Sequence, residues 1–131
     1  MPRKSNPLKN RLPFKKDSKG SIVQGMTMLT SGAYMSLSAQ EKVALIVMQI
    51  HWRNDRAVSY GCRELALNVP CSKDTALKIF RNLSAKGFIE CTDPGWFDSA
   101  NGSRSRDWRL TWMPFNGKPA TDEWIKWTPE N

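Results

Sequence analysis

The segment from residue 61 to residue 87 constrains the fold more strongly than any other part of the chain, because a proline separates two runs of regularly spaced apolar residues. In the first run the apolar residues follow the i, i+3, i+4, i+7 spacing that places them on one face of a helix. Pro70 cannot continue that helix. We therefore expect a helix from about residue 61 to residue 68, followed by a turn. Its apolar face consists of Cys62, Leu65, Ala66 and Val69.

The second run is bounded by residues that favour a helix start and a helix end. Ser72 is a preferred N-cap residue, and Gly87 is the residue type found just past a helix C-terminus. We expect a helix that continues to Lys86, with one apolar side facing the core at about 100° per residue. That side consists of Ala76, Ile79, Phe80 and Leu83, and the opposite side of Asp74, Thr75, Lys78, Arg81, Asn82 and Ala85.

An earlier helix is predicted from residue 38 to about residue 53. Ser38 and Glu41 have the spacing of a capping box, in which each side chain bonds the other residue's amide. A helix with apolar residues on two sides is expected to be covered on both flanks, so we place it at the centre of the domain. Residues 22–34 before it are expected to form a short strand or an extended stretch. The two apolar stripes are Val43, Ile46, Val47 and Ile50, and Leu45, Met48 and Trp52.

Strands are predicted at residues 57–60, 88–92 and 108–112, where apolar and polar residues alternate. Trp108, Leu110 and Trp112 share one face of the last strand. The resulting order is helix, strand, helix, turn, helix, strand, long loop and strand. Two helices joined by a turn are common, but this ordered set is typical of a winged helix-turn-helix. We therefore expect an α+β, mainly α fold with a three-helix core and a β-hairpin wing.

The run ELALNVPCSKDTALKIFRNLSAKGFI, residues 64–89, resembles the helix-turn-helix of bacterial winged-helix regulators. The resemblance is close over about a quarter of the chain and looser over residues 37–112. It departs from the family at Pro70, where such turns often have glycine. The flanks, including GAYMSLS, are similar to small winged-helix proteins of phages, plasmids and other mobile elements. The matching residues are Leu65-Ala66, Cys71, Ser72-Lys73-Asp74-Thr75, Leu83 and Gly87-Phe88-Ile89.

The polar side of the helix at residues 72–86 carries the groups that read base edges. Lysine and arginine suit guanine, asparagine suits adenine, and threonine suits a base or a thymine methyl group. The free amides at the helix start and the Ser72 hydroxyl suit a phosphate. The alternative is an ordinary solvated helix surface. The candidate DNA-binding residues here are Ser72, Lys73, Asp74, Thr75, Lys78, Arg81 and Asn82.

The loop before the last strand begins with small polar residues, SANGS, and then carries Arg104 and Arg106 at alternate positions. We expect both arginines to project from one side of a flexible tip toward the DNA backbone or a narrow minor groove. The alternative is that Asp98 and Asp107 pair with them.

At the base of this hairpin, Trp96 and Phe97 on one arm face Trp108 on the other in the predicted pairing. Such cross-strand aromatic contacts contribute about 0.2–1 kcal/mol each. We therefore expect an aromatic staple at the base of the wing.

The chain is basic, but its charge is concentrated at the start. Of the formal net charge of +8, residues 1–20 supply +6, from seven Lys and Arg against Asp17. We predict that residues 1–21 are a disordered basic arm beside the helix at residues 72–86, the predicted recognition helix. The arm is expected to follow a neighbouring groove of a polyanion such as DNA. The alternative is a solubilising tail. The arm's candidate DNA-binding residues are Arg3, Lys4, Lys9, Arg11, Lys15 and Lys16.

At 131 residues the chain suits one domain, predicted at residues 22–113, with a C-terminal extension at residues 114–131. Residues 121–127 are expected to form a short capped helix carrying Trp124 and Trp127. These tryptophans are predicted to close the second face of the helix at residues 38–53. The alternative is a dimer contact, because a lone winged helix reads few base pairs and many bind as homodimers on symmetric half-sites.

Catalysis is not expected. His51 is the only histidine, and it lies among apolar positions, as a structural histidine does. No other histidine is present to act as the general base for a Ser or Cys nucleophile. The sequence has no Gly-rich phosphate loop, and Cys62, Cys71 and Cys91 lack metal-ligand spacing, so we expect three small buried side chains and neither metal nor cofactor. The absence of a long apolar run or secretory signal indicates a cytoplasmic, nucleoid-associated protein with no membrane partner.

The function indicated is sequence-specific binding of double-stranded DNA, most simply as a transcriptional regulator. Two alternatives stay open. One is a replication-initiation or recombination accessory protein of a plasmid or phage, distinguished by whether the bound site is a promoter or an origin or attachment site. The other is an adaptor that uses the winged helix to bind protein.

Overall fold

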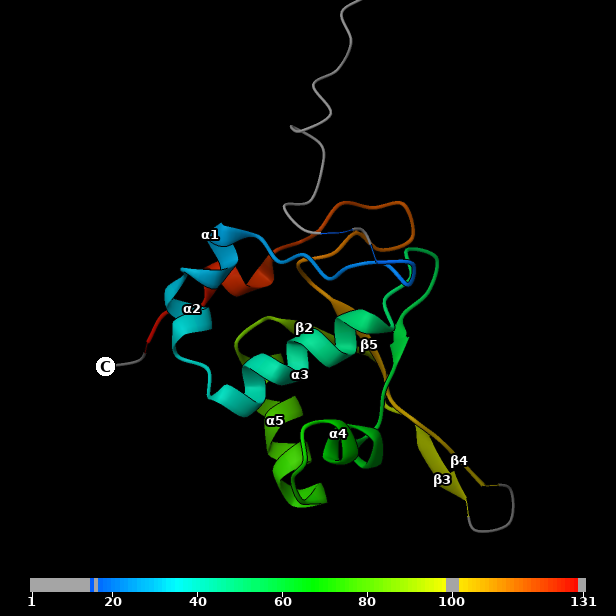
Figure 1. Cartoon of the computed structure of the whole chain (residues 1–131). Coiled ribbons are helices and arrows are strands. Elements are labelled where there is room, and N and C mark those ends of the chain that lie inside the picture. The colour runs from blue at the N-terminus through cyan, green and yellow to red at the C-terminus, as the bar shows by residue number, and fades with distance from the viewer. Residues whose placement is uncertain (1–14, 16, 99–101, 130–131) are drawn as a thin grey trace, which may run out of the picture.

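The computed structural model describes residues 15, 17–98 and 102–129 of the chain. Over these residues the chain forms an α+β domain in which helices pack against a small antiparallel sheet (Figure 1). This confirms the predicted class. In chain order the elements are α1 (Met26–Leu29), α2 (Gly32–Met35), α3 (Ala39–Ile50), β1 (Val58–Ser59), α4 (Cys62–Asn68), α5 (Lys73–Ala85), β2 (Ile89–Asp93), β3 (Trp96–Asp98), β4 (Gly102–Arg104), β5 (Asp107–Leu110) and the 3-10 helix η1 (Glu123–Lys126).

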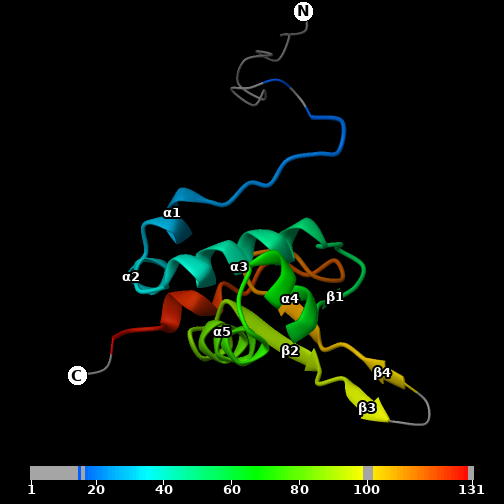
Figure 2. The same ribbon diagram turned by 60° about the horizontal axis from the view of Figure 1, so that its bottom comes forward.

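The larger sheet has three antiparallel strands in the order β1-β5-β2. Its register places Trp108 of β5 opposite Val58 of β1 on one side and Cys91 of β2 on the other. The pairing of β2 with β5 shifts between Cys91 and Asp93. Beyond this irregularity the chain enters β3 and β4, which pair with each other. Figure 2 shows that the β3–β4 hairpin projects from the body of the domain.

The start of α3 and the start of α5 confirm the capping predictions. In α3 the Glu41 amide donates to Ser38 Oγ at 3.1 Å, and the Ser38 amide donates to Glu41 Oε1 at 2.8 Å. In α5 the Thr75 amide donates to Ser72 Oγ at 3.1 Å. These side chains satisfy amides that have no partner inside the helix. Local hydrogen bonding therefore fixes where both helices begin.

Gly87 follows α5 with a backbone φ of +85°, which residues other than glycine rarely adopt. A Cβ at this position would also lie 2.8 Å from the carbonyl carbon of Glu123. Glycine is therefore required both by the turn that ends α5 and by the close approach of the C-terminal segment.

The core contains the apolar side of α5, as predicted, because all four of its side chains are buried. The ring of Phe80 stacks on Trp108 with centroids 4.7 Å apart and planes at 17°. The Trp108 indole N–H donates to the carbonyl oxygen of Tyr60 at 2.9 Å, which satisfies the one polar atom of that ring. Burial of one large apolar side chain contributes about 1.5–3 kcal/mol. The contact of Phe80 with Trp108 thus joins α5 to the sheet.

Residues 22–34 differ from the prediction of a strand or extended stretch. They contain the two single-turn helices α1 and α2. Ser31 caps α2 by accepting a hydrogen bond from the Tyr34 amide at 3.1 Å. A helix of four residues is too short to display the i, i+3, i+4, i+7 repeat, so periodicity could not identify it.

The prediction that α3 is covered on both flanks is wrong. Val43, Ile46 and Ile50 are 40%, 40% and 55% exposed, whereas Leu45 and Met48 on the opposite face are fully buried. The C-terminal segment, expected to cover the exposed stripe, packs elsewhere. Trp124 is buried and its ring lies parallel to that of Phe88, with centroids 6.3 Å apart.

Within residues 121–127 a short helix is present as the 3-10 helix η1, but the predicted cap is wrong, because no side chain makes a capping hydrogen bond at its start. Asp122 precedes it with φ 49°, in the left-handed region, and accepts a hydrogen bond from the Trp124 indole N–H at 3.1 Å. Trp127 is half-buried beneath the ammonium group of Lys86, which lies 5.2 Å from the ring centroid. Both tryptophans therefore pack at the C-terminal end of α5.

Candidate nucleic-acid interface

The outward side of α5 forms a ridge of exposed residues opposite the buried face of the helix. At 3.6 residues per turn the ridge residues lie within about 60° of one another around the helix axis. Their exposure confirms the orientation that the sequence predicted for this helix. The ridge consists of Asp74, Lys78, Arg81 and Ala85.

The charged side chains of the ridge have no intramolecular partner in the part of the chain that the structure describes. Asp74 and Lys78 are four residues apart, a spacing that often brings a carboxylate to an ammonium group, yet they form no ion pair. Arg81 likewise makes no hydrogen bond with the described residues. The ridge therefore presents one acceptor group and two donor groups that are available to a ligand.

The N-terminal end of α5 places Ser72 and Thr75 together. Besides accepting from the Thr75 amide, the Ser72 hydroxyl donates to Thr75 Oγ1 at 3.0 Å. The two hydroxyl groups are therefore hydrogen-bonded to each other at the start of the helix. The first-turn amides of Lys73 and Asp74 have no acceptor within the helix, and such amides attract anions. Ser72 acts mainly as the cap, and the Lys73 side chain is exposed on the flank of the helix rather than on the ridge.

Asn82 is exposed, as predicted, but its amide is not free. Its Nδ2 donates to Oε2 of Glu41 in α3. The other carboxylate oxygen of Glu41 accepts from the Ser38 amide, so the buried carboxylate serves the cap of α3 and the side chain of α5 together. Sequence reasoning identified Glu41 only as a capping residue. Its second partner is 41 positions away and left no local signal.

A shallow hollow of about 550 Å³ separates the start of α3 from the flank of α5. The Asn82–Glu41 contact lies in this hollow, beside the ridge. Its polar lining comes from both helices, so the hollow extends from the flank of α5 to the start of α3. Besides Glu41 and Asn82, its polar lining residues are Ser38, Gln40, Thr75, Lys78 and Arg81.

The strand register differs from the pairing that the predicted aromatic staple requires. The register pairs Trp96 with Arg104 and Phe97 with Ser103, so Trp108 faces neither aromatic residue. Trp108 lies instead between the neighbouring strands of the larger sheet and is buried against α5. Burial of its large ring in the core outweighs the small gain of a cross-strand contact on the surface.

The two loop arginines lie at the inner end of the hairpin. Arg104 ends β4, and its side chain lies outside the described residues, as does the tip at residues 99–101. Arg106 joins β4 to β5 and is half-buried, and its carbonyl oxygen accepts from the Tyr60 amide at 2.9 Å. Arg106 is therefore attached to the sheet rather than to the loop tip.

Most of the basic arm lies outside the described residues, namely Arg3, Lys4, Lys9, Arg11 and Lys16. Lys15 is described and exposed. Residues 17–25 run along the side of α3 away from α5 in both views, although we expected the arm to lie beside the recognition helix (Figures 1 and 2). Residues 17–21, the described end of the arm, therefore lie on the other side of α3 from α5.

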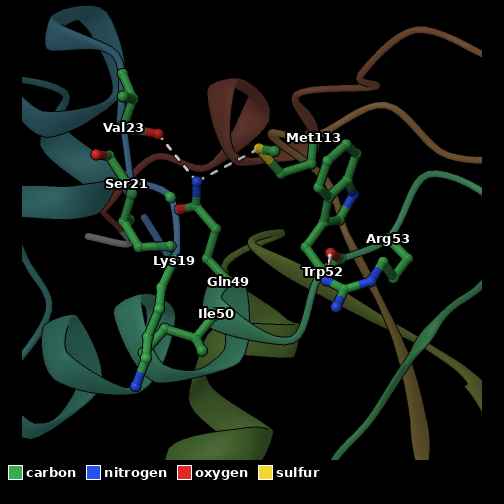
Figure 3. Close-up of a pocket in the computed structure, with 10 residues that line it drawn as sticks. Lys19, Ser21, Val23, Gln49, Ile50, Trp52, Arg53 and Met113 are labelled. Carbon is green, nitrogen blue, oxygen red and sulfur yellow. Dashed lines mark hydrogen bonds between the residues drawn. The ribbon is translucent and has the colours of Figure 1, made fainter. Parts of the chain in front are cut away.

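A pocket of about 460 Å³ lies where residues 19–23 cross the end of α3 (Figure 3). Gln49 at its base donates to the Val23 carbonyl oxygen at 2.9 Å and to Met113 Sδ at 3.7 Å. Its Oε1 accepts from Gln24 Nε2 and from Trp112 Nε1, both at 3.1 Å. With both ends of the amide engaged, Gln49 joins the segment before α1 to the segment after β5. Trp112, predicted on the strand, lies just beyond the end of β5 and makes this contact.

The remaining chemistry-bearing residues are separate from one another. His51 is exposed with its ring 5.4 Å from that of Tyr60. Cys62 and Cys71 are half-buried and Cys91 is exposed, so the expectation that all three are buried is wrong. Among the described residues, no group of three His, Cys, Asp or Glu side chains could hold a metal ion. The described helices are also all too short or too polar to cross a membrane.

Comparison of the chain with models of protein families, with curated proteins and with solved structures finds no match.

Proposed function

We propose that this protein is a winged helix-turn-helix protein that binds double-stranded DNA at specific sequences and regulates transcription. The observation that carries the proposal is the ridge of α5. It presents a carboxylate, an ammonium and a guanidinium group that have no partner among the described residues. Helix α5 lies on the same side of α3 as the projecting β3–β4 hairpin (Figure 1).

The topology supports this assignment. Helices α3, α4 and α5 are followed by the strands β2 and β5, which pair with each other and are connected through the β3–β4 hairpin. Strand β1 pairs with the other edge of β5, which gives the order β1-β5-β2. Cys71, in the turn between α4 and α5, donates its amide to the Ala66 carbonyl oxygen at 3.0 Å, which makes that turn tight. A fixed turn holds the second helix of such a pair at a defined angle, as a groove-reading helix requires.

The dimensions and chemistry of the two partners agree. An α-helix with its side chains is about 10–12 Å in diameter, and the major groove is about 12 Å wide. In this arrangement Lys78 and Arg81 face base edges, and the free amides at the start of α5 face a phosphate. The β3–β4 hairpin, with Arg104, contacts the backbone or the minor groove at the flank.

The experiment is binding-site selection from a randomised duplex library, followed by mobility-shift titration on the enriched site. The wild-type protein should enrich a defined motif. Lys78→Ala and Arg81→Ala should each weaken binding to that motif by about 1–3 kcal/mol and relax preference at one position. Lys118→Ala is the matched control, because Lys118 is exposed in the loop after β5. That loop, drawn in orange, lies on the other side of α3 from α5 (Figure 1).

The proposal is wrong if the selection enriches no motif and the two ridge variants bind like Lys118→Ala. Mapping of the bound sites to promoters, or instead to origins or attachment sites, distinguishes regulation from replication or recombination. The stoichiometry on the enriched motif tests the predicted homodimer, since two symmetric half-sites require two copies.

A further inference from the structure

We propose that α5 reads a short stretch of C·G base pairs through Asp74, Lys78 and Arg81, and that Asn82 is a positioning residue held out of the groove by Glu41. This inference rests on the proposed DNA binding by α5 and names the kind of sequence that the helix selects.

The position of Asn82 argues against base reading. Asparagine recognises adenine when its amide oxygen and an N–H both face the base edge. Here Asn82 lies about 70° around the helix from the centre of the ridge. Its Nδ2 is bonded to Oε2 of Glu41, which turns the amide toward α3. Rotation of Asn82 into the groove would remove a donor from a buried carboxylate, which is costly for a charged group.

The same contact fixes the rotation of α5 about its own axis. Glu41 is held on one side by the Ser38 amide at 2.8 Å, so it cannot follow Asn82 if α5 turns. Rotation by one residue position, about 100°, would replace ridge residues with flank residues at the outer surface. The bond between α3 and α5 therefore determines which side chains of α5 meet a ligand.

The three free side chains of the ridge match one type of base pair. A carboxylate accepts a hydrogen bond from the amino group of cytosine, and lysine and arginine donate to O6 and N7 of guanine. Asp74 also disfavours any base that presents an acceptor at its position, because two acceptors would then face each other. Since Asn82 is withdrawn, the ridge has no asparagine or glutamine to recognise adenine.

The spacing along the helix limits the length of the site. With a rise of 1.5 Å per residue, Asp74 and Arg81 are about 10 Å apart along the helix axis. This corresponds to about three steps of 3.4 Å along B-DNA. The ridge therefore spans about three or four successive base pairs.

The test is binding-site selection with the wild-type protein and single variants, with Lys118→Ala as the control. The wild-type motif should contain a core of C·G pairs. Lys78→Ala and Arg81→Ala should each lose preference for one guanine, and Asp74→Ala should lose preference for one cytosine. Asn82→Ala should weaken binding to the best site and to its single-base variants by one common factor, about three- to tenfold, with the motif unchanged.

Glu41 variants separate positioning from a general loss of stability. Glu41→Gln should bind DNA within about twofold of wild type, because glutamine can still accept from Ser38 and donate to Asn82 Oδ1. Glu41→Ala should resemble Asn82→Ala, and the double variant Glu41→Ala/Asn82→Ala should be no weaker than either single variant. Thermal unfolding of each variant establishes that the assayed protein is folded.

Two outcomes overturn the inference alone. They are an Asn82→Ala motif that loses an adenine at one position, and a wild-type motif core without C·G pairs. A wild-type selection that enriches no motif overturns the proposed function as well as this inference.

Discussion

The aromatic rings of Phe80 and Trp108 are stacked 4.7 Å apart, and this contact ties α5 to the central strand of the sheet. Trp108 belongs to β5, which leads directly out of the β3–β4 hairpin. The packing of this pair of rings therefore contributes to the orientation of the helix relative to the hairpin. Both parts of the proposed DNA surface are anchored at this point.

Trp108→Ala should lower the free energy of unfolding by about 3–5 kcal/mol, since it leaves a cavity beside Phe80 and removes the donor to the Tyr60 carbonyl oxygen. Chemical denaturation monitored by circular dichroism measures this loss. Trp127→Ala, which removes a half-buried indole at the C-terminal end of α5, should cost clearly less. Equal losses in the two variants would contradict the central role of Trp108.

Local signals were sufficient to predict several elements. Ser38, Ser72 and Gly87 mark helix ends because the groups they satisfy lie within a few residues of them. Periodicity identified the buried side of α5 because that helix is 13 residues long, more than three turns. The single-turn helices α1 and α2 gave no such pattern.

Contacts between distant residues could not be predicted in this way. Trp108 alternates correctly as a strand residue, but alternation does not show whether it packs against Trp96 or Phe80. Gln49 is a polar residue on a helix, yet its partners lie 25 to 64 positions away. The Glu41–Asn82 bond has the same character. The sequence therefore predicted which face of α5 is polar, but not which of its polar side chains are free.

Gly87→Ala should destabilise the protein more than Gly20→Ala. Both glycines have positive φ, +85° and +98°, so both substitutions strain the backbone. At Gly87 the added Cβ would also meet the backbone of Glu123 at 2.8 Å, whereas at Gly20 nothing lies within 4 Å. Differential scanning calorimetry of the two variants isolates the steric contribution. Identical melting temperatures of the two variants would show that the backbone of Glu123 does not pack closely against residue 87.

Stability should decrease at high pH because burial raises the pKa of Tyr60 above its usual value of 10.0. The nearby Glu64 carboxylate also raises this pKa, while the hydrogen bond from Asn68 lowers it. The folded state binds the phenolic proton more tightly than the unfolded state. Its contribution to stability is therefore complete below pH 10 and is lost as the pH rises through the raised pKa.

Absorbance titration of the phenolate measures this effect in Tyr34→Phe, which leaves Tyr60 as the only tyrosine of the two in the chain. Tyr60 should ionise at higher pH in the folded protein than in denaturant. Tyr60→Phe should weaken the decline of unfolding free energy above pH 10. If Tyr60 ionises at the same pH in the folded and the denatured protein, its ionisation does not contribute to the loss of stability at high pH.

Removal of residues 1–16 should weaken binding to all DNA sequences by a common factor without changing the selected motif. The deleted segment carries six basic residues and no acidic ones, so its contribution comes from release of counterions from the phosphates. The slope of log K against log salt concentration should become shallower by up to about five if every deleted cation neutralises a phosphate. Fluorescence anisotropy at several salt concentrations measures this slope.

A chain in which residues 1–16 are replaced by an uncharged Gly-Ser segment of equal length should behave like the deletion. If the deletion keeps the wild-type slope, the arm does not contact DNA, and the salt dependence comes from α5 and the β3–β4 hairpin.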